Sequence, residues 1–436
     1  MKISLTDKKI YKNVVWLFVR LMLMSIINLV SVRFARGDSG LGLESYGIFN
    51  AVFGIVNLMG CLNTVLASAS QRFFSVAMAD SNHDSLKSQY NASLRISIRL
   101  SLLVFVVLET VGLWFVISKM NYPDSMFMEV MIIYQTSIFS FIAMLIQAPY
   151  LALVMAYEKM NIYAVISLSG AFLKLALALM LCLFDNHRLM IYGIGWMVVS
   201  IITSLWFFIY CKRHFPECEY DSKCITKNIR TMLSFSGWTL YGSVAGALML
   251  QGSNLLLNTY VGPFANAAFA VSLQIYYAFV SLGTSVMSAV RPQMVMSYTE
   301  KNYKQTQRLF IISTGLVSLL LIVIIVPFQI FIPQILEIWL GNVDSMTITM
   351  SRIFVYFAAV MIISEPITIV MQASGKVKQY HLPVESIMVL GFPINWLFLS
   401  KGVNAAVVPF SLLLLAIAAY IVRVIIMSTV HSNVSK

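Results

Sequence analysis

Four charged residues lie inside long apolar stretches of the chain, namely Arg20, Glu109, Lys174 and Glu365. A charge at the middle of a bilayer costs at least ~2.5–3.5 kcal/mol, so such residues usually pair with one another or face a polar cavity. A carboxylate in such a place can exchange a proton or a cation. A lysine or arginine there can hold an anionic group such as a phosphate.

Glu109 and Lys174 are predicted to lie at a similar depth, because each follows the start of its apolar stretch by a similar number of residues. Two interpretations of these residues are open. They could form an ion pair that holds two helices together. Alternatively, Glu109 exchanges a proton or cation while Lys174 contacts an anionic substrate.

Arg20 has no acidic residue three or four positions away and shares a helical face with Asn28 and Ser31. We expect its guanidinium to bind phosphate oxygens, with snorkelling to the membrane surface as the structural alternative. Glu365 precedes Pro366, which is expected to kink its helix. A carboxylate beside a kink predicts a gating or ion site, and an interfacial glutamate near a helix end is the alternative.

The stretches that carry these charges are long enough to cross a membrane as helices, which need about 20 apolar residues. Hydrophobic residues make up 59% of the 436 and charged residues 11%, and the mean hydropathy is +0.82. A backbone in lipid must satisfy its own hydrogen bonds, so each stretch is expected to be helical. We predict about twelve spans, at roughly 13–33, 47–69, 96–118, 128–148, 162–183, 189–210, 235–257, 266–289, 309–331, 350–372, 382–400 and 404–426.

The net charge of +12 follows the membrane-orientation pattern of basic loops. If the chain begins in the cytoplasm, lysine and arginine are concentrated in the cytoplasmic links and are scarce in the outer ones. We therefore predict a multi-pass protein with both termini in the cytoplasm and no nucleic-acid partner.

The chain is predicted to consist of two halves. The longest and most charged link lies near the middle, at about residue 211 to 233. A short pattern after the fourth span recurs after the tenth at one constant offset, with Pro149, Ala156, Lys159 and Tyr163 matched by Pro366, Ala373, Lys376 and Tyr380. We predict an N-terminal lobe at 1–215, a linker at 216–234 and a C-terminal lobe at 235–436. The fold class is an all-α membrane protein of two six-helix lobes with pseudo-two-fold symmetry.

Two such lobes can enclose a central cleft, and polar faces on several predicted helices point to one. The alternative is that these polar side chains only join helices, at ~0.6 kcal/mol each. The candidate cavity residues are Arg20, Asn28, Asn57, Lys174, Gln251, Asn254 and Gln274, and Glu109 and Glu365 are the candidates for ion coupling or ion pairing.

The sequence shows no constellation typical of an enzyme. Cys211, Cys218 and Cys224 lie with His214 around the central link, but their spacing matches no standard zinc pattern, and we interpret them as free thiols. There is no nucleophile–base arrangement and no phosphate-binding loop. We therefore predict no catalytic residue, no metal site and no cofactor.

Several short segments resemble one family of membrane proteins. They are Glu44-Ser-Tyr-Gly-Ile-Phe-Asn50, Ser68-Ala-Ser-Gln-Arg-Phe73, Ser234-Phe-Ser-Gly-Trp238, Gly262-Pro263 with Asn266-Ala-Ala268, and Leu336-Glu-Ile-Trp-Leu-Gly341. Their order and spacing resemble those of bacterial polysaccharide (O-antigen) flippases of the multidrug/oligosaccharidyl-lipid/polysaccharide (MOP) exporter superfamily.

The resemblance implies the two-lobed fold typical of multidrug and toxin extrusion (MATE) transporters, with alternating access at the inner membrane. It implies a substrate of sugars on undecaprenyl pyrophosphate, membrane lipids as partners and a polysaccharide polymerase as a further candidate partner. A proton or sodium gradient is a candidate driving force. It also implies a cationic cavity, which Arg20 and Lys174 would suit.

There are two alternatives to a flippase. An ion-coupled drug or metabolite antiporter of the same superfamily usually has an acidic residue on the first helix, where this chain has Arg20. A membrane polymerase or ligase would need a sizeable outer loop with catalytic residues, and the predicted outer links are short.

Overall fold

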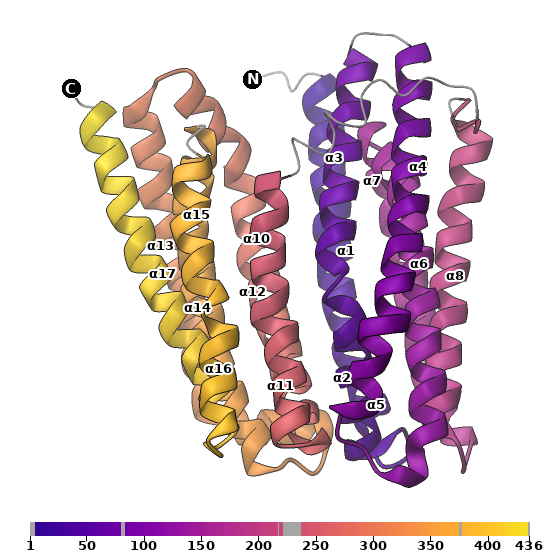
Figure 1. The fold of residues 1–436 in the computed structure, drawn as a ribbon. Helices are drawn as coiled ribbons and strands as arrows, with labels where there is room; N and C mark the ends of the chain where they lie inside the picture. The colour runs from indigo at the N-terminus through magenta and orange to yellow at the C-terminus, as the bar shows by residue number, and fades with distance from the viewer. Residues whose placement is uncertain (1–4, 80–82, 217, 221–236, 375–376, 435–436) are drawn as a thin grey trace. The chain divides into compact units, whose positions relative to one another are not determined.

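A computed structural model of the chain describes residues 5–79, 83–216, 218–220, 237–374 and 377–434. Every regular element in these ranges is a helix, and they contain no strand (Figure 1). The predicted all-α fold class is confirmed. Within lipid this is the expected outcome, because a helix satisfies all its backbone hydrogen bonds internally.

The chain divides into two compact units, Met1–Ala247 and Leu248–Lys436. Unit 1 contains α1 (Leu5–Arg36), α2 (Gly42–Asn57), α3 (Gly60–Ala79), α4 (His83–Val107), η1 (Leu108–Gly112), α5 (Leu113–Ser118), η2 (Asp124–Met126), α6 (Phe127–Ala156), α7 (Met160–Met180), η3 (Leu181–Leu183), α8 (Arg188–His214) and α10 (Gly237–Ala247). Unit 2 contains η4 (Leu248–Gly252), α11 (Ser253–Tyr260), α12 (Pro263–Thr299), α13 (Tyr303–Leu340), α14 (Ser345–Ala373), α15 (Val377–Val389), α16 (Gly391–Ser400) and α17 (Val407–Val434). The predicted linker at 216–234 lies largely outside the described residues, so the lobe boundaries stay a prediction.

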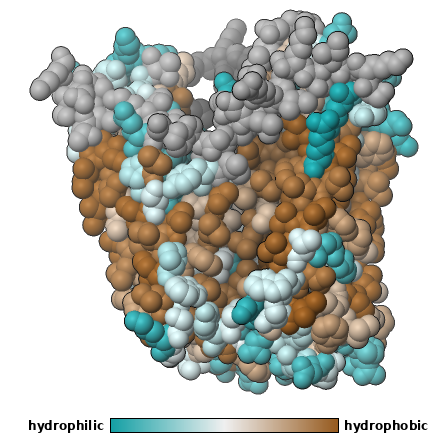
Figure 2. All heavy atoms as spheres, in the orientation of Figure 1, coloured by the Kyte–Doolittle hydropathy of each residue, from teal (hydrophilic) through white to brown (hydrophobic). Residues whose placement is uncertain are grey.

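Nine described helical runs are long and apolar enough to cross a membrane, or up to ten if the bent pair Gly42–Asn57 and Gly60–Ser75 forms one span. Each of the twelve predicted spans overlaps at least one described helix. Large apolar side chains face outward, such as Leu102 at 66% exposure and Val323 at 61%. On the face drawn in Figure 2, apolar residues cover the middle of the helices and hydrophilic residues gather toward their ends. The chain is thus a multi-pass membrane protein.

In unit 1, α6 is the central helix, because it contacts α2, α3, α4, α7 and α8. A larger share of α6 is buried than of α4, α7 or α8. Its buried positions include the small residues Ser137, Ser140 and Ala148. Small side chains let neighbouring helix backbones approach closely, which is the usual basis of helix association in lipid.

In unit 2, α12 and α14 pack along each other and are the most buried helices. Ser272 and Ser351 share a hydrogen bond of 3.1 Å across this contact. Gly283 of α12 lies directly against Ile362 of α14, where an added Cβ would collide with the isoleucine side chain. The glycine is therefore needed for close approach of the two helices.

Two helical runs contain a π-helical turn, η1 and η4. In η1 the Leu113 amide donates to the Leu108 carbonyl, five residues back, instead of the usual four. The Tyr134 hydroxyl of α6 donates to the same carbonyl at 2.6 Å. Gly112 lies against that hydroxyl, and a Cβ there would collide with it. The turn is therefore held by a specific contact with the central helix.

Two of the matched pairs of the predicted internal repeat, the prolines and the alanines, occupy equivalent places in two helices, whereas Lys376 lies outside the described residues. Pro149 lies inside α6 and Pro366 inside α14. The two helices end at the matched alanines, Ala156 and Ala373. A tertiary context that tolerates an internal proline at the same distance from the helix end favours a common origin for the two segments.

Candidate functional site

Unit 1 contains a cavity of about 290 Å³ between α2, α6, α7 and α8. Its walls combine apolar, hydroxyl and amide side chains with a single charged residue, Lys174. The lining residues are Phe53, Val56, Asn57, Ser137, Ser140, Phe141, Met144, Gln147, Lys174, Trp196, Ser200, Thr203 and Ser204.

Lys174 is held against an aromatic wall of the cavity. Its ammonium lies 3.8 Å from the ring centroid of Trp196 on α8. The Trp196 ring lies edge-on to Phe49, Phe53 and Tyr192, with centroids 5.6, 5.6 and 5.8 Å away. A cation over tryptophan gains ~0.5–2 kcal/mol, more where water is excluded. This contact offsets part of the cost of placing the charge in the membrane and leaves the ammonium free to donate to a ligand.

The polar lining of the cavity comes mainly from α6 and α8. The Ser204 hydroxyl donates to Gln147 Oε1 at 2.9 Å and to the Ala143 carbonyl at 3.2 Å, joining the two helices. Ser200 and Ser140 donate to carbonyls one turn earlier in their own helices, at 2.9 and 2.7 Å. Because these hydroxyl hydrogens are used, the oxygens present mainly acceptor lone pairs to the cavity.

The predicted residues Asn57 and Lys174 line this cavity together. Asn57 is the last residue of α2, and its side chain is exposed to the cavity space. The amide adds a donor and an acceptor beside the ammonium. Together with the hydroxyls, the arrangement suits a ligand with many hydroxyl groups and one anionic group.

The suggested ion pair between Glu109 and Lys174 is not formed, and both residues belong to the described part of the chain. Glu109 lies in η1, where Gln135 Nε2 of α6 donates to its Oε2 at 3.2 Å. Its other oxygen, Oε1, is buried and has no hydrogen-bond partner among the described residues. Glu109 follows α4 and Lys174 lies on α7, and both of these helices contact α6. Each charge has its own partner, so a similar depth does not bring the two together.

Arg20 lies outside the cavity. Its guanidinium carbon is 4.2 Å from the ring centroid of Tyr163 on α7, and its buried Nε has no described hydrogen-bond partner. Tyr163 precedes Lys174 by eleven residues on α7, which is roughly 16 Å along a helix at 1.5 Å per residue. Asn28, on the same helix as Arg20, is exposed. The structure therefore does not bring Arg20 and Asn28 to the Lys174 site.

The predicted residues of unit 2 fall into separate places. Asn254 is buried and accepts a hydrogen bond of 2.7 Å from Asn266, a contact that joins α11 to α12. Gln251 lies in the π-turn η4 and Gln274 is half-buried on α12. Asn254 thus joins two helices, which is the structural alternative to lining a cavity.

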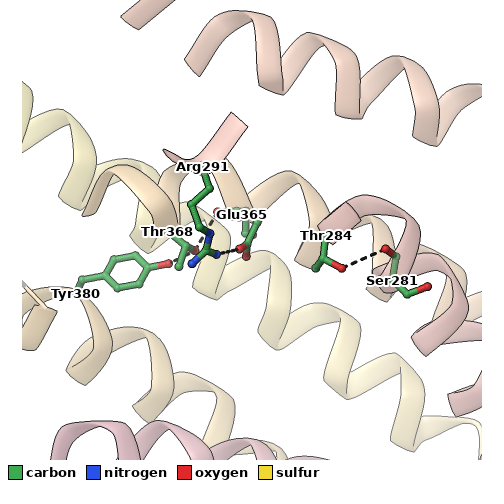
Figure 3. Close-up of polar contacts among 7 residues, drawn as sticks. Ser281, Thr284, Arg291, Glu365, Thr368 and Tyr380 are labelled. Atoms are coloured by element: carbon green, nitrogen blue, oxygen red, sulfur yellow. Dashed lines mark hydrogen bonds and ion pairs between the residues drawn. The ribbon is translucent and has the colours of Figure 1, made fainter. Parts of the chain in front are cut away.

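Glu365 of α14 forms an ion pair with Arg291 of α12, with Oε1 and the guanidinium nitrogen 2.5 Å apart. Figure 3 shows the two side chains pointing toward each other. Beside them, the hydroxyls of Thr368 and Tyr380 share a hydrogen bond of 2.5 Å. Arg291 is about half exposed and Glu365 about a quarter exposed. This pair links α12 to α14 near one end of their contact.

Several residues that line the cavity are not among the candidates predicted from the sequence. Trp196, Ser200, Thr203 and Ser204 recur at intervals of three and four on α8, which is a helical face that the sequence does show. Arg423 of α17 is a further charged residue that is not among the sequence candidates. Arg423 is 7% exposed, with its guanidinium 5.9 Å from the Tyr380 ring centroid.

Comparisons with known proteins identify the fold. Residues 243–397 match the MatE family. No curated protein matches the chain significantly. Among solved structures, an inward-facing MATE transporter of the MOP superfamily is similar, with a TM-score of 0.72 and 13% identity over 94% of this chain and 95% of that one.

Two further structures have the same fold. An outward-facing MATE transporter gives a TM-score of 0.69 with 13% identity, over 97% of this chain and 96% of that one. A MOP superfamily transporter from Pyrococcus furiosus gives 0.68 with 13% identity, over 98% and 96%. The chain therefore has the fold of these MATE transporter structures, which is the two-lobed fold that the sequence resemblance implied.

Proposed function

We propose that this protein is a membrane transporter that flips lipid-linked oligosaccharide repeat units across the inner membrane for surface-polysaccharide assembly. The observation that carries the proposal is the cavity of unit 1. Its only charged lining residue in the described part of the chain is Lys174, and it contains no carboxylate. An ammonium suits a pyrophosphate, and the surrounding hydroxyls and amides suit sugars.

Alternating access is the mechanism that the fold supports. The similar structures include one described as inward-facing and one described as outward-facing. In such a cycle the cavity shields the sugars and the pyrophosphate from lipid, while the polyprenyl tail remains in the bilayer. A proton or sodium gradient, or consumption of product on the far side by a polymerase, would give the transport its direction.

A second candidate is an ion-coupled antiporter of drugs or metabolites. One similar structure is described as a multidrug resistance transporter. In this chain the buried and unpartnered Oε1 of Glu109 would suit proton exchange. The cavity charge argues for the flippase, because an ammonium repels the cationic drugs that a carboxylate would attract. A reversed binding-pocket polarity has been taken to suggest a different function for the Pyrococcus furiosus transporter.

The decisive experiment is performed on lipid extracts from cells that lack the protein. The flippase proposal expects undecaprenyl-pyrophosphate-linked oligosaccharide with one complete repeat unit to accumulate, together with loss of surface polymer. Re-expression of the wild-type chain should reverse both changes. The mass of the accumulated species would identify the sugar.

A different result would favour the antiporter. If no lipid-linked intermediate accumulates and surface polysaccharide is intact, the flippase proposal is wrong. Efflux assays with cationic dyes would then test the second candidate, with Glu109→Gln as the variant expected to lose activity.

A further inference from the structure

Unit 2 contains a second cavity, of about 300 Å³, that the proposed transport function does not use. It lies between α12, α13, α14 and α17, and most of its lining is apolar. Met371 forms a fully buried part of the lining, whereas Ile311 and Val424 are 60% and 43% exposed. The cavity is therefore closed on the inside of the unit and open on its exposed surface.

The cavity lies near the ends of the helices that line it, where we infer that the hydrocarbon meets the headgroups. Its lining comes from the beginning of α13, the last turn of α14 and the C-terminal half of α17. Two tyrosines, Tyr298 and Tyr303, line it at the turn between α12 and α13. Tyrosine is enriched at this level because its ring is apolar and its hydroxyl is polar.

The wall at this turn is preformed. Ser297 and Thr306 share a hydrogen bond of 2.9 Å across the turn, and the Tyr298 and Tyr303 rings lie edge-to-face with centroids 5.7 Å apart. The Asn302 side chain caps α13 by accepting from the Gln305 amide at 3.2 Å. A wall fixed in this way does not have to be ordered when a ligand binds.

Two basic residues lie on the segment of α13 that lines the cavity. Lys304 and Arg308 are exposed and lie one turn apart on α13, beside the lining residues Gln307 and Ile311. The neighbouring charges at the turn, Glu300 and Lys301, are of opposite sign and offset each other. The start of α13, which lines the apolar cavity, therefore carries a net positive charge.

We propose that this cavity binds one acyl chain of an anionic phospholipid, whose phosphate is held by Lys304 and Arg308. An apolar hollow open to the bilayer is filled by lipid chains, and basic residues near a membrane surface attract anionic headgroups. The charge complementarity selects an anionic phospholipid over a zwitterionic one. The inference holds whichever substrate the cavity of unit 1 carries.

The test is native mass spectrometry of the full-length protein in detergent with added phosphatidylglycerol or with phosphatidylcholine of the same chains. The wild type should retain phosphatidylglycerol and retain phosphatidylcholine much less. The double variant Lys304→Gln/Arg308→Gln should weaken phosphatidylglycerol retention roughly tenfold or more. A matched double variant in unit 1, Lys212→Gln/Arg213→Gln, removes the same charge and should retain the lipid.

A second pair of variants tests the cavity without changing charge. Ser428 lines the cavity at its α17 wall, and Ser428→Phe should fill it and reduce retention. Ser400→Phe places the same ring at an exposed position at the end of α16 and should have no effect. Thermal unfolding of each variant checks that the fold is intact.

Three outcomes would overturn the proposal. Equal retention of both lipids would show that the charges of Lys304 and Arg308 do not select the lipid. Equal loss in both double variants would show general attraction to a basic surface. Retention of added undecaprenyl phosphate with none of phosphatidylglycerol would assign the cavity to a polyprenyl chain instead.

Discussion

The charged residues within the predicted spans differ in the interactions that stabilise them. Lys174 lies on the Trp196 ring and has no ion-pair partner among the described residues, whereas Glu109 is bonded to Gln135 through one oxygen only. A charge that is shielded but not neutralised remains available to a ligand. Lys174 is therefore the residue whose replacement should affect transport most directly.

Lys174→Ala should reduce transport roughly tenfold or more while the protein level stays normal, because hydrogen bonds to charged groups contribute ~1.5–3 kcal/mol. Lys174→Arg should restore part of the activity, since it keeps the charge but changes the geometry. The measurement is recovery of surface polysaccharide in cells lacking the protein. Lys401→Ala, at an exposed position, is the control, and normal recovery with Lys174→Ala would contradict the ligand-binding role.

Reversal of the charges at Glu109 and Lys174 tests whether the two residues interact. The double variant Glu109→Lys/Lys174→Glu should be as inactive as the single variants, because the residues have different partners, Gln135 and Trp196. A double-mutant cycle on protein level and transport measures this. Recovery of function in the double variant would show that the two charges pair.

The residue types of the site could be predicted, but their partners could not. The cost of a buried charge identifies Lys174 from sequence, and helical spacing places Asn57 on a polar face. Depth along a helix says nothing about rotation around it, which is why Glu109 does not meet Lys174. Arg20 lies away from the cavity because its partner Tyr163 is eleven residues from Lys174 along α7. The contact with Trp196 depends on packing between α7 and α8, which no periodicity within either helix contains.

At the scale of elements, the π-turn η1 depends on Tyr134. Tyr134→Phe removes the hydroxyl that donates to the Leu108 carbonyl and should lower stability by ~0.6 kcal/mol, up to ~1.7. Tyr356→Phe is the matched control, because Tyr356 is 49% exposed on α14. Thermal unfolding in detergent compares the two, and equal melting temperatures for both variants and the wild type would contradict the role.

The contact between α12 and α14 depends on Gly283. Gly283→Ala should destabilise unit 2 by about 1–3 kcal/mol, the usual cost of overpacking, because Ile362 is branched at Cβ and cannot move aside easily. Gly315→Ala on α13 adds the same methyl group where nothing lies within 4 Å. It should leave stability unchanged or raise it. Chemical unfolding measures both, and a Gly283→Ala variant as stable as the wild type would contradict the tight contact.

The elements themselves were largely predictable. Apolar length alone places each predicted span on a described helix, since the bilayer fixes the length a helix needs. The π-turns η1 and η4 were not predictable, because the residues of both turns are compatible with an ordinary α-helix. Their hydrogen-bond pattern is decided by contacts such as that with Tyr134.

At the scale of the whole molecule, the distribution of basic residues sets the orientation in the membrane. An even number of spans places both termini on the same side, and the concentration of lysine and arginine in alternate links predicts the cytoplasm. Reporter fusions at residue 1 and residue 436 should both report a cytoplasmic location. A fusion in the 341–344 link should report the opposite side, and agreement of all three reporters would contradict the predicted orientation.

The whole fold could be predicted from a few short motifs, although identity to the similar structures is only 13%. A bilayer requires each spanning segment to satisfy its own hydrogen bonds, so the all-helical class follows from the apolar stretches. The MATE-like arrangement was implied by the resemblance of the motifs. The substrate does not follow from the fold. It depends on the side chains of one cavity of about 290 Å³.

The π-turn η1 also makes its helix tolerant of the deletion of one residue, which would disrupt a regular α-helix. A π-turn contains one residue more than the α-helix around it, so deletion of Thr110 would leave a regular helix. Val116, which is fully buried, would keep its place. Loss of Leu103 from the regular part of α4 would instead turn every later residue by roughly 100°. Within this helical run, single-residue deletions among natural variants should therefore fall in 108–112. Such a deletion should leave the helix intact but change the surroundings of Glu109.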